Sequence, residues 1–582
     1  MHQQSSTLKF FCVGLFVCTA FSSFAGWVLN EDKTQLSDGY WTLAVVADGE
    51  NLKITSLTAG TGDLDLSDVS EDTAGYKITA IGPSAFNKKT GLTSICAPDV
   101  IVVEDGASNV NSPFYNCTAL TNAALPSATT IGNFAFRSCT ALYDVSFESV
   151  TKIGNESFSH CGSLTNIEVN AGITSIGASA FAHTSSRQAC VLKTFKPTTL
   201  PALHTIGEKA FWGPSGSYLE GDFYMPALTN LGSLAMQNSK ITSFRAPSLT
   251  YIHDNAFYGS QNLTNVEVSA DITYIGVQAF ARTSTYQTCV VKTFKPTTLP
   301  KLEVIGQQAF YGKSGSSLEG DFYMPALTNL GSEAMRSSKI TSFRAPALTY
   351  LSDYAFTGSA NLTNMEVSAD ITYIGVQAFA RMNTYEKLQL QSFKPTTLPK
   401  LEVIGQQAFF GNSGSYLVGD FYCPALTNIG LSAFNQAKIT SFRAPKLSDI
   451  GRFAFSMCRS ISNVVVRGGG VFGEKSLYGV EVDSPIINVL GPAPTSLGAN
   501  AIYAASGYDY PQVRVARSKY LEDWKNLDGI TFIPFETAKE NKTYAKYLGT
   551  TPEDKTLGLI TGKGTFWLVD DDTTKHTIFT LR

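Results

Sequence analysis

The stretch LTNAALPSATTIGNFAFRSCTAL, residues 120–142, contains the pattern that decides the fold. Its first part places apolar residues at alternate positions, as a short strand does when one of its faces is buried. Pro126 then ends the strand, because proline cannot donate a hydrogen bond to a sheet. The second part, I-G-x-x-A-F, turns the chain and sets a phenylalanine inward. One such unit cannot bury its own apolar face, so the stretch predicts one coil of a stacked repeat protein.

The same unit recurs along most of the chain. Its I-G-x-x-A-F segment, or a close variant, begins at Ile81, Ile131, Ile153, Ile176, Ile206, Leu231, Ile252, Ile275, Ile404, Ile429 and Ile450. A longer period is superimposed on it, because ITSFRAP fills residues 241–247, 340–346 and 439–445, a step of 99 residues. Blocks of this length start at Ile173, Ile272 and Ile371, and each contains four coils. The two periods predict a solenoid of about 16 coils.

The unit L-T-x-Φ-x-Φ-P…I-G-x-x-A-F-x-x-C-x-x-L, in which Φ is apolar, resembles the BspA-like family of bacterial leucine-rich repeat surface proteins over roughly residues 78–530. The resemblance implies a leucine-rich-repeat solenoid, with short parallel β-strands stacked coil on coil and turns and short helical segments on the other side. It also implies a secreted or cell-surface protein that serves adhesion or protein recognition and has no enzymatic activity. The longest coils depart from the family pattern, because they carry extra loops such as residues 213–221.

The two ends of the chain lack the unit and are predicted to cap the solenoid. Residues 1–25 are predicted to be a signal peptide, with an apolar run at 10–21 and small residues before the cleavage site. A lipidated Cys18 is the alternative, disfavoured because Val17 stands where a small residue is required. The further predicted boundaries are a β-rich N-terminal cap at 26–77, the solenoid at 78–480, a C-terminal cap at 481–534, and a tail at 535–582 with a β-hairpin near 557–570. The role of the tail, as an extra cap or as an export or attachment module, stays open.

Cysteine occupies one fixed position of the unit. Cys117, Cys139 and Cys161 follow each other at intervals of 22 residues, and other copies place serine there, as in YGSQNL at 258–263. A position that accepts either residue is predicted to be a small, tightly packed corner, so we expect buried free thiols rather than disulfides. The chain contains no C-x-x-C pair, which argues against a zinc or redox site.

Composition and motifs exclude several classes of function. The net charge is −4 and the basic residues are scattered, so no field attracts nucleic acid or an anionic membrane. No apolar run of about 18 residues follows the leader, so no membrane span is expected after its removal. The sequence has no H-E-x-x-H, no G-x-S-x-G and no G-x-x-x-x-G-K-[ST] motif. We therefore expect no catalytic, cofactor-binding or metal-binding residues and no enzyme.

The strand pattern also predicts which side chains leave the core. In ITSFRAP the apolar residues point inward, and Ser243 and Arg245 point outward. The second outward position of successive strands forms what we call the outward column: Glu168, Lys196, Tyr224, Arg245, Glu267, Lys295, Tyr323, Arg344, Glu366, Lys394, Tyr422 and Arg443. Parallel strands stack about 4.8 Å apart, so neighbours in this column are expected to touch.

Two interpretations of the outward column remain open. In the first, its members satisfy one another through ion pairs and cation–π contacts, and the column is purely structural. In the second, it displays three equal patches of Tyr, Arg and Lys, roughly 20 Å apart, that bind host or neighbouring-cell proteins or glycans with avidity. The second interpretation corresponds to a secreted or cell-surface adhesin. The first is compatible with an envelope scaffold that binds only itself. The sequence leaves the ligand, attachment mode and oligomeric state open.

Overall fold

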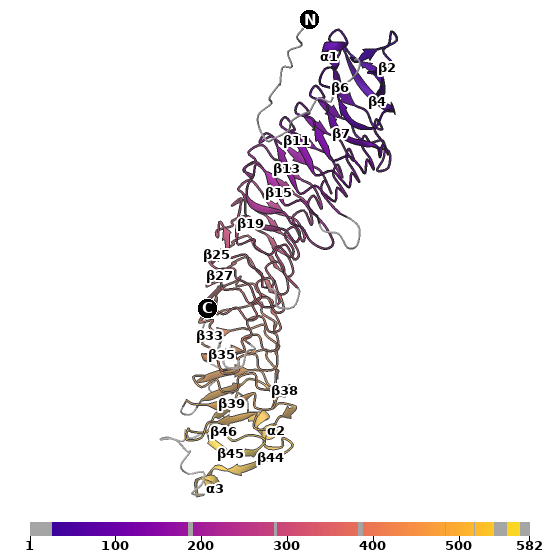
Figure 1. The fold of residues 1–582 in the computed structure, drawn as a ribbon. Coiled ribbons are helices and arrows are strands. Elements are labelled where there is room, and N and C mark those ends of the chain that lie inside the picture. The colour runs from indigo at the N-terminus through magenta and orange to yellow at the C-terminus, as the bar shows by residue number, and fades with distance from the viewer. Residues whose placement is uncertain are drawn as a thin grey trace. The chain divides into compact units, whose positions relative to one another are not determined.

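The computed structural model describes residues 26–183, 190–283, 288–381, 388–411, 413–482, 485–516, 518–540 and 556–570. The predicted signal peptide, residues 1–25, lies outside the described residues. The chain forms two compact units, residues 1–269 and 270–582. In both units short parallel strands are stacked coil on coil (Figure 1). We call the strands that carry the outward column the front strands, and the short strands of the I-G-x-x-A-F segments the back strands.

The first unit begins with antiparallel strands and continues as parallel coils. The antiparallel strands are β1 (Val28–Leu29), β2 (Gln35–Ser37), β3 (Thr42–Asp48) and β4 (Asn51–Ala59), and the short helix α1 (Val69–Asp72) follows. The back strands are β6 (Ile78–Ile81), β8 (Val102–Val103), β10 (Thr130–Ile131), β12 (Lys152–Ile153), β14 (Ser175–Ile176), β16 (Thr205–Ile206), β18 (Asn230–Leu231) and β20 (Tyr251–Ile252). The front strands are β5 (Gly62–Asp65), β7 (Leu92–Cys96), β9 (Asn122–Ala124), β11 (Asp144–Phe147), β13 (Asn166–Val169), β15 (Thr194–Lys196), β17 (Glu220–Tyr224), β19 (Lys240–Ala246) and β21 (Asn265–Val268).

The second unit begins with parallel coils and ends with antiparallel strands. Its back strands are β22 (Tyr274–Ile275), β24 (Val304–Ile305), β26 (Asn329–Leu330), β28 (Tyr350–Leu351), β30 (Tyr373–Ile374), β32 (Val403–Ile404), β34 (Asn428–Ile429), β36 (Asp449–Ile450), β38 (Val471–Phe472) and β41 (Ser496–Leu497). Its front strands are β23 (Thr293–Lys295), β25 (Asp321–Tyr323), β27 (Ser342–Arg344), β29 (Asn364–Glu366), β31 (Ser392–Lys394), β33 (Val418–Tyr422), β35 (Lys438–Ala444), β37 (Asn463–Val466), β40 (Ile486–Val489) and β43 (Gln512–Val515). Strands β39 (Leu477–Val480) and β42 (Ile502–Ala504) pair with each other.

The end of the second unit is closed by a compact group of elements. The antiparallel strands β46 (Phe566–Asp570), β45 (Thr556–Gly562) and β44 (Ile530–Pro534) extend the front sheet beyond β43. The helical segments are η1 (Ser518–Tyr520), α2 (Leu521–Lys525) and α3 (Phe535–Glu540). Trp524 of α2 is fully buried, with its ring 6.5 Å from that of Phe472 and 5.7 Å from that of Phe566. The Trp524 side chain therefore packs on the apolar core at the last coils.

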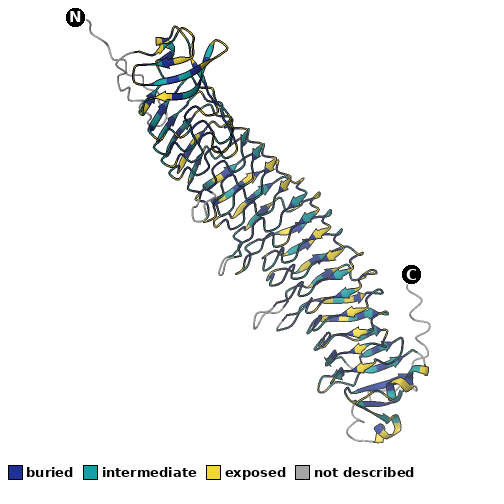
Figure 2. Ribbon diagram, turned by 90° about the vertical axis from the view of Figure 1, so that its right-hand side faces the viewer, coloured by how far each residue is buried: buried dark blue, intermediate teal, exposed yellow. Residues whose placement is uncertain are grey.

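The coil of residues 120–142 shows how the repeated unit folds. Its first part forms the front strand β9, and its second part forms the back strand β10 and a turn. Phe134, in the turn, adopts a left-handed backbone with φ 61°. The buried side chains of this coil are Leu120, Ala123, Leu125, Ala128, Ile131, Ala135, Phe136, Cys139 and Leu142. Burial alternates with exposure along the strands of other coils in the same way (Figure 2).

A ladder of phenylalanine rings runs through the core. In the first unit Phe86, Phe114, Phe136, Phe158, Phe181 and Phe211 stack with centroids 4.6–5.4 Å apart and ring planes within 7° of parallel. The second unit repeats the arrangement from Phe356 through Phe379, Phe409 and Phe434 to Phe455. Met236 and Met335 take the same position in the motif and are buried. The phenylalanines of successive coils thus pack on one another, except where methionine takes their place.

The predicted leucine-rich-repeat solenoid with parallel strands is confirmed. The I-G-x-x-A-F segments turn the chain as expected, and each also contributes a short back strand that the sequence did not predict. The four short helices of the described residues all lie outside these segments, in 69–72, 518–525 and 535–540. A left-handed residue inside every turn prevents helical propagation there.

The cysteine position behaves as the packing argument predicts. Cys117, Cys139, Cys161, Cys190, Cys289, Cys423 and Cys458 are buried free thiols. Cys139 Sγ donates to the carbonyl oxygen of Phe114 at 3.0 Å, and Ser260 Oγ makes the equivalent bond to Met236 at 3.1 Å. Either side chain therefore fits a corner that needs one short donor. Cys96 lies on β7, outside this corner position, and its side chain is half-buried.

Candidate recognition surface

The front strands bring members of the outward column into register. In the first unit Glu168 lies opposite Lys196, and Tyr224, Arg245 and Glu267 lie opposite one another on β17, β19 and β21. The second unit repeats this order with Tyr323, Arg344, Glu366 and Lys394, and then with Tyr422 and Arg443. The phenylalanines between these positions, such as Phe244, are buried. The alternation predicted from ITSFRAP therefore places the column outside the core.

Each tyrosine of the column carries the guanidinium of the next strand over its ring. The distance from the arginine Cζ to the ring centroid is 4.7 Å for Arg245 and Tyr224, 4.6 Å for Arg344 and Tyr323, and 5.2 Å for Arg443 and Tyr422. We call these the Tyr–Arg pairs. An exposed contact of this kind contributes about 0.5–1 kcal/mol and holds both side chains in a defined orientation.

The ion pairs expected within the column do not form. In the part of the chain that the structure describes, no ion pair within 4.0 Å joins two members of the outward column. Lys196, Lys295 and Lys394 are exposed, and Glu168 is exposed as well. Charges held at adjacent strand positions without direct pairing stay hydrated and accessible, so the interpretation that the column satisfies itself applies only to the Tyr–Arg pairs.

The column is interrupted between each lysine and the following tyrosine. Tyr224 bridges to Thr199 rather than to Lys196, because its N–H donates to the Thr198 carbonyl oxygen and its own carbonyl accepts from Leu200. The same bridges join Thr298 to Tyr323 and Thr397 to Tyr422. The sheet therefore ends at β15 and starts again at β17, and an open groove of about 440 Å³ lies at this break. The prediction that each tyrosine of the column contacts the preceding lysine is therefore wrong.

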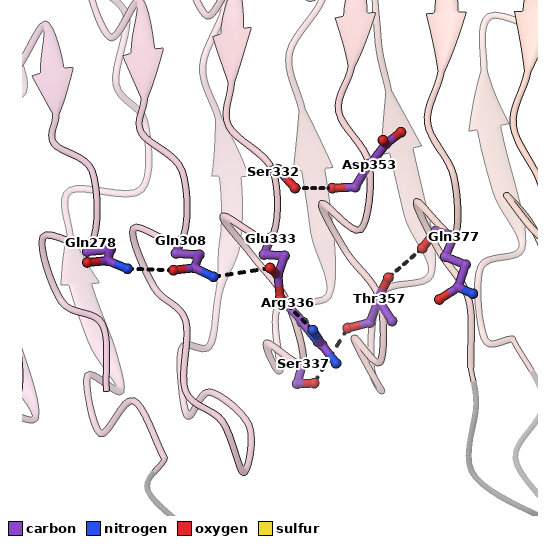
Figure 3. Close-up of polar contacts among 9 residues, drawn as sticks. All are labelled: Gln278, Gln308, Ser332, Glu333, Arg336, Ser337, Asp353, Thr357 and Gln377. Atoms are coloured by element: carbon purple, nitrogen blue, oxygen red, sulfur yellow. Dashed lines mark hydrogen bonds and ion pairs between the residues drawn. The ribbon is translucent and has the colours of Figure 1, made fainter. Parts of the chain in front are cut away.

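The turns of the second unit carry a different polar array. Gln278 Nε2 donates to Gln308 Oε1 at 2.6 Å, and Gln308 Nε2 donates to Glu333 Oε1 at 3.1 Å (Figure 3). Arg336 Nη1 donates to the other oxygen of Glu333 at 2.5 Å. These side chains form hydrogen bonds with one another from coil to coil. We therefore interpret them as a structural ladder and not as a second recognition surface.

The described residues contain neither a cluster of metal ligands nor a membrane-spanning helix. Among them, no group of three or more His, Cys, Asp and Glu side chains is placed to hold a metal ion. None of the described helices has the length and apolar character needed to cross a membrane. The candidate surface is the outward column with the groove at its break.

A solenoid of stacked parallel strands with a repeated outward face defines the class of leucine-rich repeat proteins. Within that class, the model of the BspA type leucine rich repeat region matches in overlapping segments, residues 67–188, 108–219, 188–295, 284–412 and 383–487. These segments span well over half of the chain, which belongs to the BspA type leucine-rich repeat family.

The chain is similar to several solved leucine-rich repeat structures at low sequence identity. A leucine rich cell surface protein from Faecalibacterium prausnitzii is 20% identical, with 75% of this chain and 95% of that chain covered and a TM-score of 0.33. A leucine-rich repeat protein from Bacteroides ovatus is 18% identical, with 75% and 94% covered and a TM-score of 0.33. The pneumococcal vaccine antigen PcpA is 15% identical, with 87% and 97% covered and a TM-score of 0.22. No curated protein matches the sequence.

Proposed function

We propose that the protein is a secreted or cell-surface recognition solenoid that mediates adhesion by binding host or neighbouring-cell proteins or glycans. The observation that carries the proposal is the repetition of the Tyr–Arg pair with one exposed, unpaired lysine in every 99-residue block. Tyrosine and arginine are the side chains most enriched at the energetic centres of interfaces. Here the stacking fixes their orientation before any ligand arrives, which lowers the entropy cost of binding.

Repetition adds avidity to these patches. The second unit alone holds two of them, around Tyr323 with Arg344 and around Tyr422 with Arg443. Four strand steps separate the two patches, roughly 20 Å at about 4.8 Å per step. A repetitive ligand bound at one patch meets the next at high effective concentration, so weak sites combine into firm attachment.

A deletion of one whole block tests the multivalent face. We would compare residues 26–582 with a variant that lacks 272–370, which removes one block and leaves the repeat register intact. Both would be applied to arrays of host matrix proteins and glycans. A steep fall in apparent affinity on removal of one block is expected. An affinity that is unchanged by the deletion contradicts a multivalent face.

Substitution of the arginines tests the patches themselves. The triple variant Arg245→Gln, Arg344→Gln and Arg443→Gln removes every Tyr–Arg pair while the strands keep their buried residues. The matched control is Lys209→Gln, Lys301→Gln and Lys400→Gln, which removes three positive charges that lie outside the column and pair with carboxylates. Loss of binding in the arginine variant alone supports recognition by the column. Equal binding by both variants assigns the arginines a structural role only.

A self-associating envelope scaffold is the second candidate. The outward column carries glutamates (Glu168 and Glu366) next to lysines (Lys196 and Lys394), and no ion pair joins them in the described residues. A face with both charges is complementary to a second copy of itself. Light scattering over a range of protein concentrations and salt would distinguish the two functions. Assembly that rises with concentration and dissolves in salt, without binding to any array, favours the scaffold.

A further inference from the structure

The groove at the break in the front sheet has a chemistry of its own. We infer that it binds a neutral, hydroxyl-rich glycan chain, with the carboxylate of Asp222 as the acceptor for sugar hydroxyl groups. The inference rests on the proposed recognition function and specifies the ligand class for one part of the same face. The groove is lined by residues of β15, β17 and β19, among them Lys196, Thr198, Asp222 and Lys240.

A β-bulge shapes this groove. Glu220 and Gly221 lie opposite Lys240 and Ile241, but Asp222 lies opposite Ser243, so Thr242 is the extra residue. Bulges are frequent where a side chain has to be re-aimed beside a functional site. The Thr242 hydroxyl donates to Oδ1 of Asp222. The bond leaves the other carboxylate oxygen of an exposed side chain directed to solvent, without a partner in the described structure.

The device is repeated in the other two blocks. Thr341 donates to Asp321 and Thr440 donates to Asp420, and in each pair, as in Thr242 and Asp222, the two residues are 20 positions apart in the sequence. The register shift recurs between Gly419 and Asp420. The threonine-oriented carboxylate is therefore common to all three blocks, and the register shift is present in the first and the third.

A glycine keeps the floor of the groove open. Gly221 has φ +126°, a backbone conformation that side chains rarely adopt, and a Cβ there would lie 3.3 Å from Thr198 Cγ2. Gly320 and Gly419 have φ values of +126° and +136°. A side chain at this position would strain the strand and fill the space between β15 and β17.

The lining of the groove disfavours both polyanions and the apolar side chains of peptides. Lys196 and Lys240 balance Glu220 and Asp222, so two positive and two negative groups leave no net charge for a polyanion. Phe195, the apolar side chain among the lining residues, is only 1% exposed, so the groove offers little apolar surface for a peptide anchor. Sugar hydroxyls both donate and accept, which matches a carboxylate and an ammonium group facing the same open groove.

The first block has the fullest set of residues for this groove. The Tyr218 ring lies 4.6 Å from Lys240 Nζ and is 46% exposed, so it offers an aromatic face beside the charged lining. Block three keeps this pair as Tyr416 and Lys438 but has Val418 in place of Glu220, and block two has Ser317 in place of the tyrosine. We therefore expect the first groove to contribute most to glycan binding.

Affinity electrophoresis of the mature chain, residues 26–582, tests the inference. The gels would contain dextran, galactomannan, arabinoxylan or mixed-linkage β-glucan, with dextran sulfate as the polyanion. The variant Asp222→Asn, Asp321→Asn and Asp420→Asn keeps an oxygen acceptor for each threonine but removes the charge. Glu148→Gln, Glu303→Gln and Glu402→Gln is the matched control, since it neutralises three exposed carboxylates outside the groove. Circular dichroism and melting temperature would show that both variants fold.

We expect at least one neutral polysaccharide to retard the wild type, and the asparagine variant to bind at least about tenfold more weakly while the control is unchanged. The inference is overturned if no neutral polysaccharide retards the protein, if both variants bind alike, or if dextran sulfate alone binds. Binding of the asparagine variant to matrix proteins on the array, without any glycan binding by the wild type, would remove the glycan inference and leave the proposed recognition function standing. Absence of both would remove both.

Discussion

Cys139 and its equivalents show how much a single buried donor matters in a solenoid. The thiol of each coil reaches the carbonyl oxygen at the phenylalanine position of the preceding coil, as in Cys139 to Phe114 and Cys161 to Phe136. Burial raises the pKa of the Cys161 thiol to about 12 and raises that of Cys139 as well. The thiols therefore stay protonated at neutral pH, and each remains a hydrogen-bond donor to its neighbour.

A pair of substitutions at Cys139 separates hydrogen bonding from packing. Cys139→Ser keeps the donor, as Ser260 does in its own coil, and we expect a loss of less than about 1 kcal/mol. Cys139→Val fills similar space but leaves the Phe114 carbonyl without this donor, and we expect it to cost about 1–3 kcal/mol. Urea denaturation followed by circular dichroism measures both. Equal midpoints for the two variants would show that the bond contributes nothing.

His160 makes part of the stability depend on pH. Its pKa is lowered from the ordinary value near 6.5 by burial first, and then by the charges of His183 and Arg137. The unfolded chain therefore takes up a proton at a higher pH than the folded chain does. The contribution of His160 is fully present above pH 6.5 and is lost as the pH falls from there towards the folded-state pKa. We expect His160→Gln to reduce the loss of stability between pH 7.5 and 5.5, measured by denaturation at both values. Parallel pH profiles for wild type and variant would contradict this role.

At the scale of the coil, the phenylalanine ladder sets the cost of changes in the core. Phe136 stacks on Phe114 at 4.6 Å and on Phe158 at 5.3 Å. Phe136→Ala would open a cavity between two coils, and we expect a loss of about 3–5 kcal/mol. Phe136→Met should cost far less, because Met236 fills the same position of the motif in the native chain. Thermal denaturation compares the two. A methionine variant as unstable as the alanine variant would mean that ring stacking, and not volume, holds the coils together.

The residue with left-handed backbone in each turn also affects the stability of the coil. Leu234 has φ 60°, and one coil later Asn255 has φ 56° at the same motif position. Asparagine tolerates this backbone, whereas a β-branched side chain does not. We expect Leu234→Asn to raise the melting temperature and Leu234→Val to lower it, with a difference of about 1–2 kcal/mol in unfolding free energy. The reverse order would show that the leucine side chain, not the backbone, dominates at this turn.

The strand pattern predicted some features of the elements and missed others for definable reasons. Alternation fixes which residues point outward, so the register of Tyr224, Arg245 and Glu267 followed from ITSFRAP and its neighbours. The break after Lys196 did not follow, because it depends on where the Thr198 and Thr199 backbone bonds after the strand has ended. The proline in FKPTTLP and the extra length of that coil were the available signals. The bulge at Thr242 leaves no mark in the pattern, since it is produced by pairing with β17.

At the scale of the molecule, we expect the terminal elements to protect the repeat core from water and from other chains. Strand β4 pairs with β6, and Leu52 and Ile54 of β4 are fully buried. Removal of residues 26–77 would uncover β6 and β7 as open sheet edges with apolar side chains beneath them. We expect this truncated chain to aggregate at concentrations where residues 26–582 stay dispersed, as size-exclusion chromatography with light scattering would show. A dispersed, folded truncated chain would mean that the first coil needs no cover.

The 99-residue spacing has a consequence for how such a chain changes over generations. Each block returns the backbone to the same motif position, so ITSFRAP at 241–247 and at 340–346 can be exchanged without shifting any strand. Unequal crossing-over between the corresponding stretches of coding sequence would add or delete one whole block, and every phenylalanine and every corner donor would still meet its partner. The number of coils, and with it the number of Tyr–Arg pairs, can therefore change from one generation to another in steps of one block, while the terminal segments stay the same.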